Sequence, residues 1–319
     1  MPRTSTRPGV LAAALFASLA LVTSAARNAE AGIIESQTTS HPFPGVLLVE
    51  GKTRVPSSAF HASIVSLCTS GIRLDATATP SALRTVPSWA TRVGAKLALN
   101  GDFFKPAPRV YGIAVGGGIE WPLEKMGIDP AVSGEWYYDH FGWIAVGPGW
   151  VDFTHTGEAK AHAEQLGLAH GFMPRTMTHD IPPGTLALVS GFPELVTEGT
   201  RYTCASPTAS TCFPDRADMR TRNPRTAMGL SFDRSIIVFA VVDGRTTVSA
   251  GMYGTELAEL MEELGAWQAF NLDGGGSSEM WLAGRGTISA PSDGRSRAVA
   301  NHWGVFVEDA PAAHCAYMR

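Results

Sequence analysis

The residues best placed to do chemistry are short polar clusters at the ends of apolar runs. The clearest follows the apolar run 267–272, where Asp273 precedes the glycines 274–276 and two serines. Consecutive glycines cost backbone entropy, so they indicate positive φ or close approach of the main chain. Their N–H groups can form a concavity for an anion or sugar oxygens, and Asp273 offers a carboxylate beside it. The structural alternative is a tight turn with an Asx hydrogen bond.

A second cluster, Asn100-Gly101-Asp102, follows the small apolar run 95–99. Asn and Asp around a glycine present amide and carboxylate groups together at a strand end. The alternative is an Asn-Gly turn in a hairpin.

Arg225 and Asp243 lie at the ends of two further strand-like runs. The planar guanidinium of arginine gives bidentate, charge-assisted bonds to a phosphate, although pairing with a structural carboxylate is equally compatible with the sequence. Asp243 precedes Gly244, and a type I′ Asp-Gly turn is its alternative.

The elements that must position these groups are mostly short strands. Apolar runs punctuated by Gly and Pro predict strands at 62–67, 96–99, 141–146, 186–189 and 236–242. One helix is expected from the cap Thr85 through Val93, and another from the cap Thr255 to Gly265, with an apolar stripe at i, i+3, i+4 and i+7. This order predicts an α+β fold in which helices pack on a mixed β-sheet.

The N-terminal segment has the pattern of an export signal. A positive n-region and an apolar run at 10–22 precede small residues, so residues 1–26 are interpreted as a signal peptide and 27–44 as a leader. The catalytic domain is then expected over 45–308, followed by a tail at 309–319. The mature protein is expected to be secreted or periplasmic, with no stable membrane insertion.

Export favours disulfides among the four cysteines. The short loop between Cys204 and Cys212 favours that pair, which leaves Cys68 and Cys315, although four cysteines permit three connectivities. The net charge of -4 and the absence of a long basic run argue against nucleic acid as a partner.

The ordered set of segments resembles the phosphodiester glycosidase family. The resemblance begins near 85–90, passes through 100–104 and 223–229, is densest over 242–278 and ends at 297–301, so it covers roughly residues 45 to 308. It implies a mixed α+β fold and hydrolysis of a sugar 1-phosphodiester. The site residues carried over by position are Asn100, Asp102, Arg225, Thr226, Asp243, Asp273, Gly274, Gly275, Gly276, Ser277 and Asn301. Asp102 departs from the pattern, since many relatives carry glycine there.

The predicted reaction is cleavage of the glycosidic C–O bond, which releases the sugar and a phosphate monoester. Asp273 is the first choice for nucleophile or base at the anomeric carbon, Asp243 the second, and Asp102 a further carboxylate. Arg225 and the glycine N–H groups would hold the phosphate. The substrate is expected among exported or cell-surface glycans. No cofactor is required by this chemistry, and a structural Ca²⁺ joining Asp273 and Asp243 is compatible with the sequence.

Two other functions fit parts of the sequence. A serine hydrolase would use Ser277 with Asp293 and His302, although the glycines around Ser277 do not complete a G-x-S-x-G elbow. An exported glycan-binding module without catalysis would stack sugars on tryptophans, for which the candidates are Trp121, Trp136, Trp143, Trp150 and Trp303.

Overall fold

The computed structural model describes residues 32–54, 57–105, 107–126, 141–155, 181–214, 216–309 and 314. The expected signal peptide lies outside these ranges. The leader expected over residues 27–44 is wrong in its described part. Residues Ile34–Phe43 form strand β1, which pairs with β2. Among the described residues, no helix is long and apolar enough to cross a membrane.

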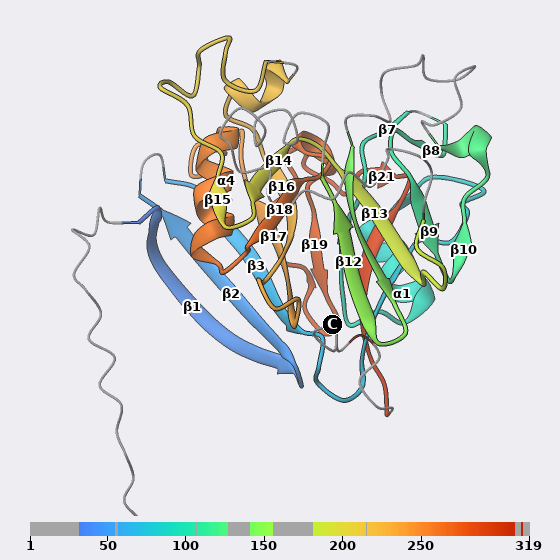
Figure 1. Cartoon of the computed structure of the whole chain (residues 1–319). Coiled ribbons are helices and arrows are strands. Elements are labelled where there is room, and N and C mark those ends of the chain that lie inside the picture. Colours follow the sequence, from blue (N-terminus) through green and yellow to red (C-terminus); the bar gives the residue numbers. More distant parts are fainter. Residues whose placement is uncertain are drawn as a thin grey trace, which may run out of the picture. The chain divides into compact units, whose positions relative to one another are not determined.

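An antiparallel sheet of eight strands is the largest element of the described chain (Figure 1). Its central strands are those that end at the polar clusters. In spatial order the strands are β1, β2 (Val46–Thr53), β3 (Ala59–Ser66), β17 (Ile236–Val242), β16 (Arg225–Leu230), β18 (Gln268–Asn271), β14 (Glu194–Thr197) and β15 (Thr200–Arg201).

Two five-stranded antiparallel sheets complete the framework. One has the order β10 (Ile119–Glu120), β9 (Ala114–Gly116), β13 (Ala187–Gly191), β11 (Gly142–Gly147) and β12 (Trp150–Thr154). The other has the order β20 (Gly286–Thr287), β19 (Met280–Leu282), β6 (Leu97–Asn100), β22 (His302–Val307) and β4 (Ile72–Ala76). Two short pairs join β5 (Arg84–Thr85) to β21 (Ala298–Val299) and β7 (Phe104–Lys105) to β8 (Arg109–Val110).

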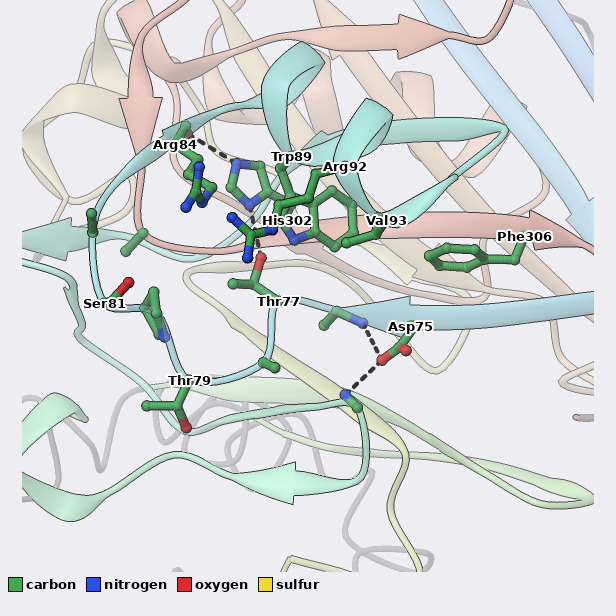
Figure 2. Close-up of a pocket in the computed structure, with 16 residues that line it drawn as sticks. Asp75, Thr77, Thr79, Ser81, Arg84, Trp89, Arg92, Val93, His302 and Phe306 are labelled. Carbon is green, nitrogen blue, oxygen red and sulfur yellow. Dashed lines mark hydrogen bonds between the residues drawn. The ribbon is translucent and has the colours of Figure 1, made fainter.

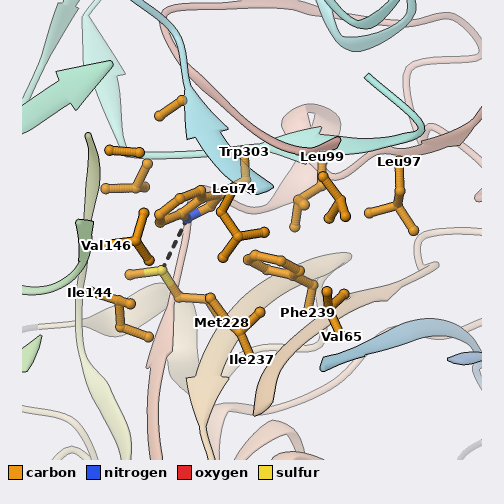
Figure 3. Close-up of a cluster of buried hydrophobic side chains, with 14 of the residues drawn as sticks. Val65, Leu74, Leu97, Leu99, Ile144, Val146, Met228, Ile237, Phe239 and Trp303 are labelled. Atoms are coloured by element: carbon orange, nitrogen blue, oxygen red, sulfur yellow. Dashed lines mark hydrogen bonds between the residues drawn. The ribbon is translucent and has the colours of Figure 1, made fainter. Parts of the chain in front are cut away.

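The main hydrophobic core lies among the inner faces of these three sheets (Figure 3). Phe239 from the eight-stranded sheet, Ile144 from the second and Leu97 and Trp303 from the third are all fully buried there. The indole N–H of Trp303 donates to the sulfur of Met228 at 3.3 Å, which satisfies its one polar group within the core.

Two α-helices cover the outer faces within the described part of the chain. Helix α1 (Val86–Val93) begins at the expected cap, because the hydroxyl of Thr85 accepts from the N–H of Ser88 at 3.3 Å. Helix α4 (Gly254–Glu263) begins earlier than expected. Its N-cap is Tyr253, whose N–H donates to the Glu256 carboxylate at 3.0 Å, so Thr255 lies inside the helix.

The fold is therefore mostly β-sheet. The expected α+β fold, with helices packed on a mixed sheet, contained too much helix. It also did not specify three sheets, because strand pairing between distant segments leaves little trace in local sequence. Three single-turn 3₁₀ helices, η1 (Leu123–Lys125), η3 (Ala217–Arg220) and η4 (Gly275–Ser277), add to α1 and α4 in the described residues.

The structure contains the disulfide Cys204–Cys212, as expected. Cys68 is also disulfide-bonded, while its expected partner Cys315 lies outside the described residues. In the C-terminal tail, His314 is buried, where it accepts from the N–H of Leu74 at 3.0 Å and donates to the carbonyl of Gly147 at 2.8 Å.

Candidate functional site

Three of the polar clusters meet where β6 and β18 end and β16 begins. The N–H of Asp273 donates to the carbonyl of Gly101 at 3.1 Å, and the side-chain amide of Asn100 donates to the carbonyl of Asp273 at 2.7 Å. The N–H of Leu272 donates to the carbonyl of Thr226 at 2.8 Å. Strand ends from two sheets thus bring the segments around Asn100, Thr226 and Asp273 to one place.

Asn100 and Thr226 are structural members of this meeting point. Both are fully buried, and the Thr226 hydroxyl donates to Asn100 Oδ1 at 2.9 Å. The N–H of Glu279 donates to the same oxygen at 3.2 Å. Both the oxygen and the NH₂ group of the Asn100 side chain are hydrogen-bonded within the protein. Asn100 therefore positions Asp273 and does not reach a substrate.

Asp102 is held by Asn301 at a buried position. Asn301 Oδ1 accepts from the N–H of Asp102 at 2.8 Å, and its amide donates to Asp102 Oδ2 at 2.7 Å. Burial raises the pKa of Asp102 well above its usual range, against the opposing effect of the Asn301 bond, and the nearby charge of Asp273 raises it further. Burial therefore favours the protonated form of Asp102.

Asp273 is half-buried, so its carboxylate is desolvated while the residue stays accessible. Burial raises its pKa to about 6, although the Ser277 hydroxyl, Arg297, Arg216 and the N–H of Gly274 all favour the charged form. Desolvation outweighs them. A carboxylate that titrates near neutral pH at an accessible position is suited to act as a base or a nucleophile.

The glycine turn is built to pass close to charged side chains. Gly275 has φ +62°, and an added Cβ would lie 3.2 Å from Arg245 Nη2. A Cβ at Gly276 would overlap Arg297 Nη2 and the Asp293 carboxylate. The N–H of Gly275 donates to the carbonyl of Pro224 at 2.9 Å, so only part of the expected concavity of N–H groups is open to a ligand.

Arg225 does not lie free to hold a phosphate. It is only 1% exposed, and its five N–H groups are used within the protein. Their acceptors are the carbonyls of Met252, Asp218 and Thr221, the Asp218 carboxylate at 3.3 Å and the sulfur of Met219. Burial lowers the pKa of Arg225 to about 10, which leaves it a cation at neutral pH. Arg225 therefore pairs with a structural carboxylate, that of Asp218, which was the alternative to phosphate binding.

Three other arginines surround Asp273 and the glycine turn. Arg216 stacks on Phe103 with 4.3 Å from its Cζ to the ring centroid, and its charge, like that of Arg297, stabilises ionised Asp273. Arg297 points Nη1 toward the Ser277 hydroxyl at 3.4 Å. The third is Arg245, beside Gly275. None of the three was selected from the sequence, although Arg245 and Arg297 fall in segments that carried the family resemblance.

Arg245 has an unusual backbone. Its φ of 60° lies in the left-handed region, which costs a non-glycine residue free energy and is often seen at functional sites. Its Nη2 donates to Asn223 Oδ1 at 2.9 Å, and the rest of the side chain is exposed. This conformation holds a cation beside the glycine turn.

Asp243 lies elsewhere. Its Oδ1 accepts from the N–H of Ala290 at 2.8 Å, and its Oδ2 lies 3.4 Å from His61 Nε2. Neither Ala290 nor His61 contacts Asp273 in this way, so the carboxylates of Asp243 and Asp273 share no hydrogen-bond partner. Among the described residues, no group of three or more His, Cys, Asp or Glu side chains comes together in a metal-binding arrangement.

The serine hydrolase geometry is absent from this site. His302 Nε2 donates to the carbonyl of Arg84 at 3.1 Å, and its Nδ1 accepts from the Thr77 hydroxyl at 2.7 Å. Burial lowers the pKa of His302 to about 3. The imidazole is fully used away from Ser277, so it cannot serve that hydroxyl as a base.

The tryptophans give little support to the glycan-binding alternative. Trp121, Trp143 and Trp303 are buried, with at most 6% exposed, and Trp150 is half-buried. Trp136 lies outside the described residues. Core packing accounts for the buried rings, which therefore cannot stack on a sugar.

Comparison with known proteins identifies the class to which this fold and site correspond. Residues 150–306 match the model of the family described as phosphodiester glycosidase, which confirms the family resemblance over that part of the chain. Over 83 residues the chain is 39% identical to the SPbeta prophage-derived uncharacterized protein YomE of Bacillus subtilis (strain 168). That match covers 26% of this chain and 13% of the relative, so it spans only a small part of the relative's length.

Two solved structures share the fold. The catalytic domain of zebrafish N-acetylglucosamine-1-phosphodiester alpha-N-acetylglucosaminidase, auto-inhibited by its pro-peptide, aligns with a TM-score of 0.56 at 16% identity. The alignment covers 85% of this chain and 87% of that one. A hypothetical protein from Synechocystis aligns with a TM-score of 0.55 at 15% identity, over 85% of this chain and 64% of the other.

Proposed function

We propose that this protein hydrolyses a sugar 1-phosphodiester by cleaving the bond between the anomeric carbon and its oxygen. The observation that carries the proposal is the half-buried Asp273, with its pKa near 6, among Arg216, Arg245 and Arg297. The family match and the shared fold support the same reaction class. The products are the free sugar and a phosphate monoester.

In this proposal Asp273 acts at the anomeric carbon. The ionised carboxylate either attacks this carbon directly, forming a glycosyl-enzyme that water then hydrolyses, or removes a proton from the attacking water. The electron pair of the C–O bond leaves with the phosphate. Because a phosphate ester is a far better leaving group than an alkoxide, the reaction needs little help from a general acid.

The three arginines stabilise the departing phosphate. Negative charge grows on the phosphate oxygens as the C–O bond breaks, and guanidinium groups fixed beside the glycine turn are oriented before that charge develops. Arg245 and Arg297 are exposed, so they can contact a ligand, and Arg297 also pairs with the Asp293 carboxylate at 2.6 Å. Arg216 is already engaged with Asp218 and the carbonyl of Phe192, so its contribution is at longer range.

Asp102 and Asp273 would divide two roles between them. Burial favours the protonated form of Asp102, while Asp273 is ionised above about pH 6. Two neighbouring carboxyl groups whose environments separate their pKa values are a recognised arrangement for acid and base catalysis. Asp102 is only 1% exposed, so we assign it the role of a neutral neighbour that avoids a second charge beside Asp273.

The proposed substrates are exported or cell-surface glycans that contain sugar 1-phosphodiesters, and the proposed location is periplasmic or secreted. The disulfide Cys204–Cys212 is typical of oxidising compartments.

Turnover of a panel of sugar 1-phosphodiesters by purified protein tests this proposal. We expect release of free sugar and phosphate monoester in equal amounts, and loss of both with Asp273→Asn. A panel that gives no products with folded wild-type protein, or equal turnover by the variant, would contradict it.

A further inference from the structure

A second cleft, of about 250 Å³, lies between α1, the segment after β4 and the start of β22 (Figure 2). None of the residues 271–278 lines it, so it is distinct from the surroundings of Asp273. Its volume is just below the roughly 300–1,000 Å³ of pockets for drug-sized ligands, which suits a small molecule.

Positive charge dominates this cleft. Arg84 and Arg92 line it, and within the described ranges no hydrogen bond or ion pair engages either guanidinium. Asp75 is the one carboxylate among the lining residues, and it is already compensated. Its oxygens accept from Arg73 Nη1 at 3.0 Å and from the N–H groups of Ala76 and Gly117 at 2.8 Å each.

Structural needs account for only one of the two arginines. Arg92 lies in the last turn of α1, where the helix dipole favours a cation. Arg84 lies on strand β5, whose backbone pairs with Val299, so no helix dipole explains its charge. Arg84 is half-buried and Arg92 is exposed, so an anion that contacts both cations in the cleft would be favourable.

The cleft is also lined by the rings of His302 and Trp89, which carry no charge at neutral pH. The imidazole of His302 is fixed between the Thr77 hydroxyl and the carbonyl of Arg84, and Trp89 stacks on it with ring centroids 4.9 Å apart. Both ring nitrogens of His302 are hydrogen-bonded within the protein, so they do not bind a ligand. The groups that remain to contact one are the two guanidinium groups and the hydroxyls of Thr79 and Ser81.

We infer that this cleft binds the phosphate group of a small phosphate ester such as a sugar phosphate, as a second anion site. Two guanidinium forks and nearby hydroxyl donors are the groups that recognise phosphate oxygens. Ala300 and His302 line the cleft, while Asn301 between them holds Asp102. A phosphate ester bound there therefore lies behind the segment that positions Asp102.

Binding of glucose 1-phosphate, followed by calorimetry and by hydrogen exchange of residues 79–93, tests this inference without any turnover. We expect glucose 1-phosphate to slow exchange in that segment. The double variant Arg84→Gln/Arg92→Gln should remove this protection and weaken binding at the cleft at least tenfold. Arg201→Gln/Arg234→Gln, which removes two arginines outside the cleft, should behave as wild type.

Inorganic phosphate and methyl glucoside separate the possible sources of affinity. Protection by inorganic phosphate supports recognition of the phosphate group itself. Equal protection by methyl glucoside, equal binding by the two double variants, or no protection of 79–93 would overturn the inference. Loss of the proposed glycosidase function would appear separately, as absent turnover with normal binding in the cleft.

Discussion

Replacing Asp273 with asparagine should abolish turnover and at the same time stabilise the fold at neutral pH. The folded pKa of Asp273 is raised from 3.8 to about 6, so the folded state binds the proton more tightly than the unfolded state. Stability contributed by this group is complete at low pH and is lost as the pH rises through the window from about 4 to about 6. Above that window the folded protein carries an unfavourable charge.

The size of this effect follows from the pKa. A change from 3.8 to about 6 corresponds to about 3 kcal/mol, at about 1.4 kcal/mol for each pH unit. Solvent at the accessible edge of Asp273 makes this an upper bound. Asparagine carries no charge, so Asp273→Asn should be more stable than wild type by up to about 3 kcal/mol at pH 7 and by much less at pH 4.

Urea unfolding at both pH values and kcat/KM from pH 4 to 8 measure the two consequences. Wild-type kcat/KM should rise with pH and level off above about 6, as Asp273 ionises, and the variant should lose roughly 10²–10⁴-fold. Asp309→Asn is the matched control, because Asp309 is exposed and lies outside the segments around Asp273. A variant that is less stable than wild type at pH 7, or that keeps its activity, would refute the reasoning.

Three further substitutions test the arginines and the glycine turn. Arg225→Gln should lower the free energy of unfolding by about 3 kcal/mol or more, because it leaves buried acceptors unpaired. Urea unfolding measures this, and an unchanged stability would mean that the role of Arg225 is catalytic rather than structural. Arg245→Ala and Arg297→Ala should lower kcat/KM for a sugar 1-phosphodiester more than for a nitrophenyl glycoside, whose leaving group has no phosphate, and equal losses would remove their proposed role. Gly275→Ala should lower stability by about 1–2 kcal/mol, since alanine is strained at φ +62°, and an unchanged Tm would contradict this.

The local elements were largely predictable from the sequence. Thr85 caps α1, and the apolar run 236–242 forms β17, because both follow from residues close in the chain. The expected leader was wrong from residue 34 to 43. Its exposed, polar strand β1 lies at a sheet edge, where pairing with β2 on one side replaces the hydrophobic pattern of a buried strand.

The site was predictable as a set of segments, but not as individual roles. Asp273, Asn100 and Thr226, which the family resemblance named together, are joined by hydrogen bonds at the ends of strands from two sheets. Arg225 and Arg245 look alike in sequence. Only the three-dimensional contacts distinguish the first, buried among carbonyl groups, from the second, held at positive φ beside Gly275.

The bond that breaks is the central claim, and isotope labelling tests it most directly. In ¹⁸O-labelled water, a single turnover of a sugar 1-phosphodiester should place the label on the C1 hydroxyl of the released sugar, as detected by mass spectrometry. The phosphate monoester should remain unlabelled, because Asp273 acts at carbon and the phosphate leaves with its own oxygen. Label in the phosphate monoester would mean attack at phosphorus and would contradict the account.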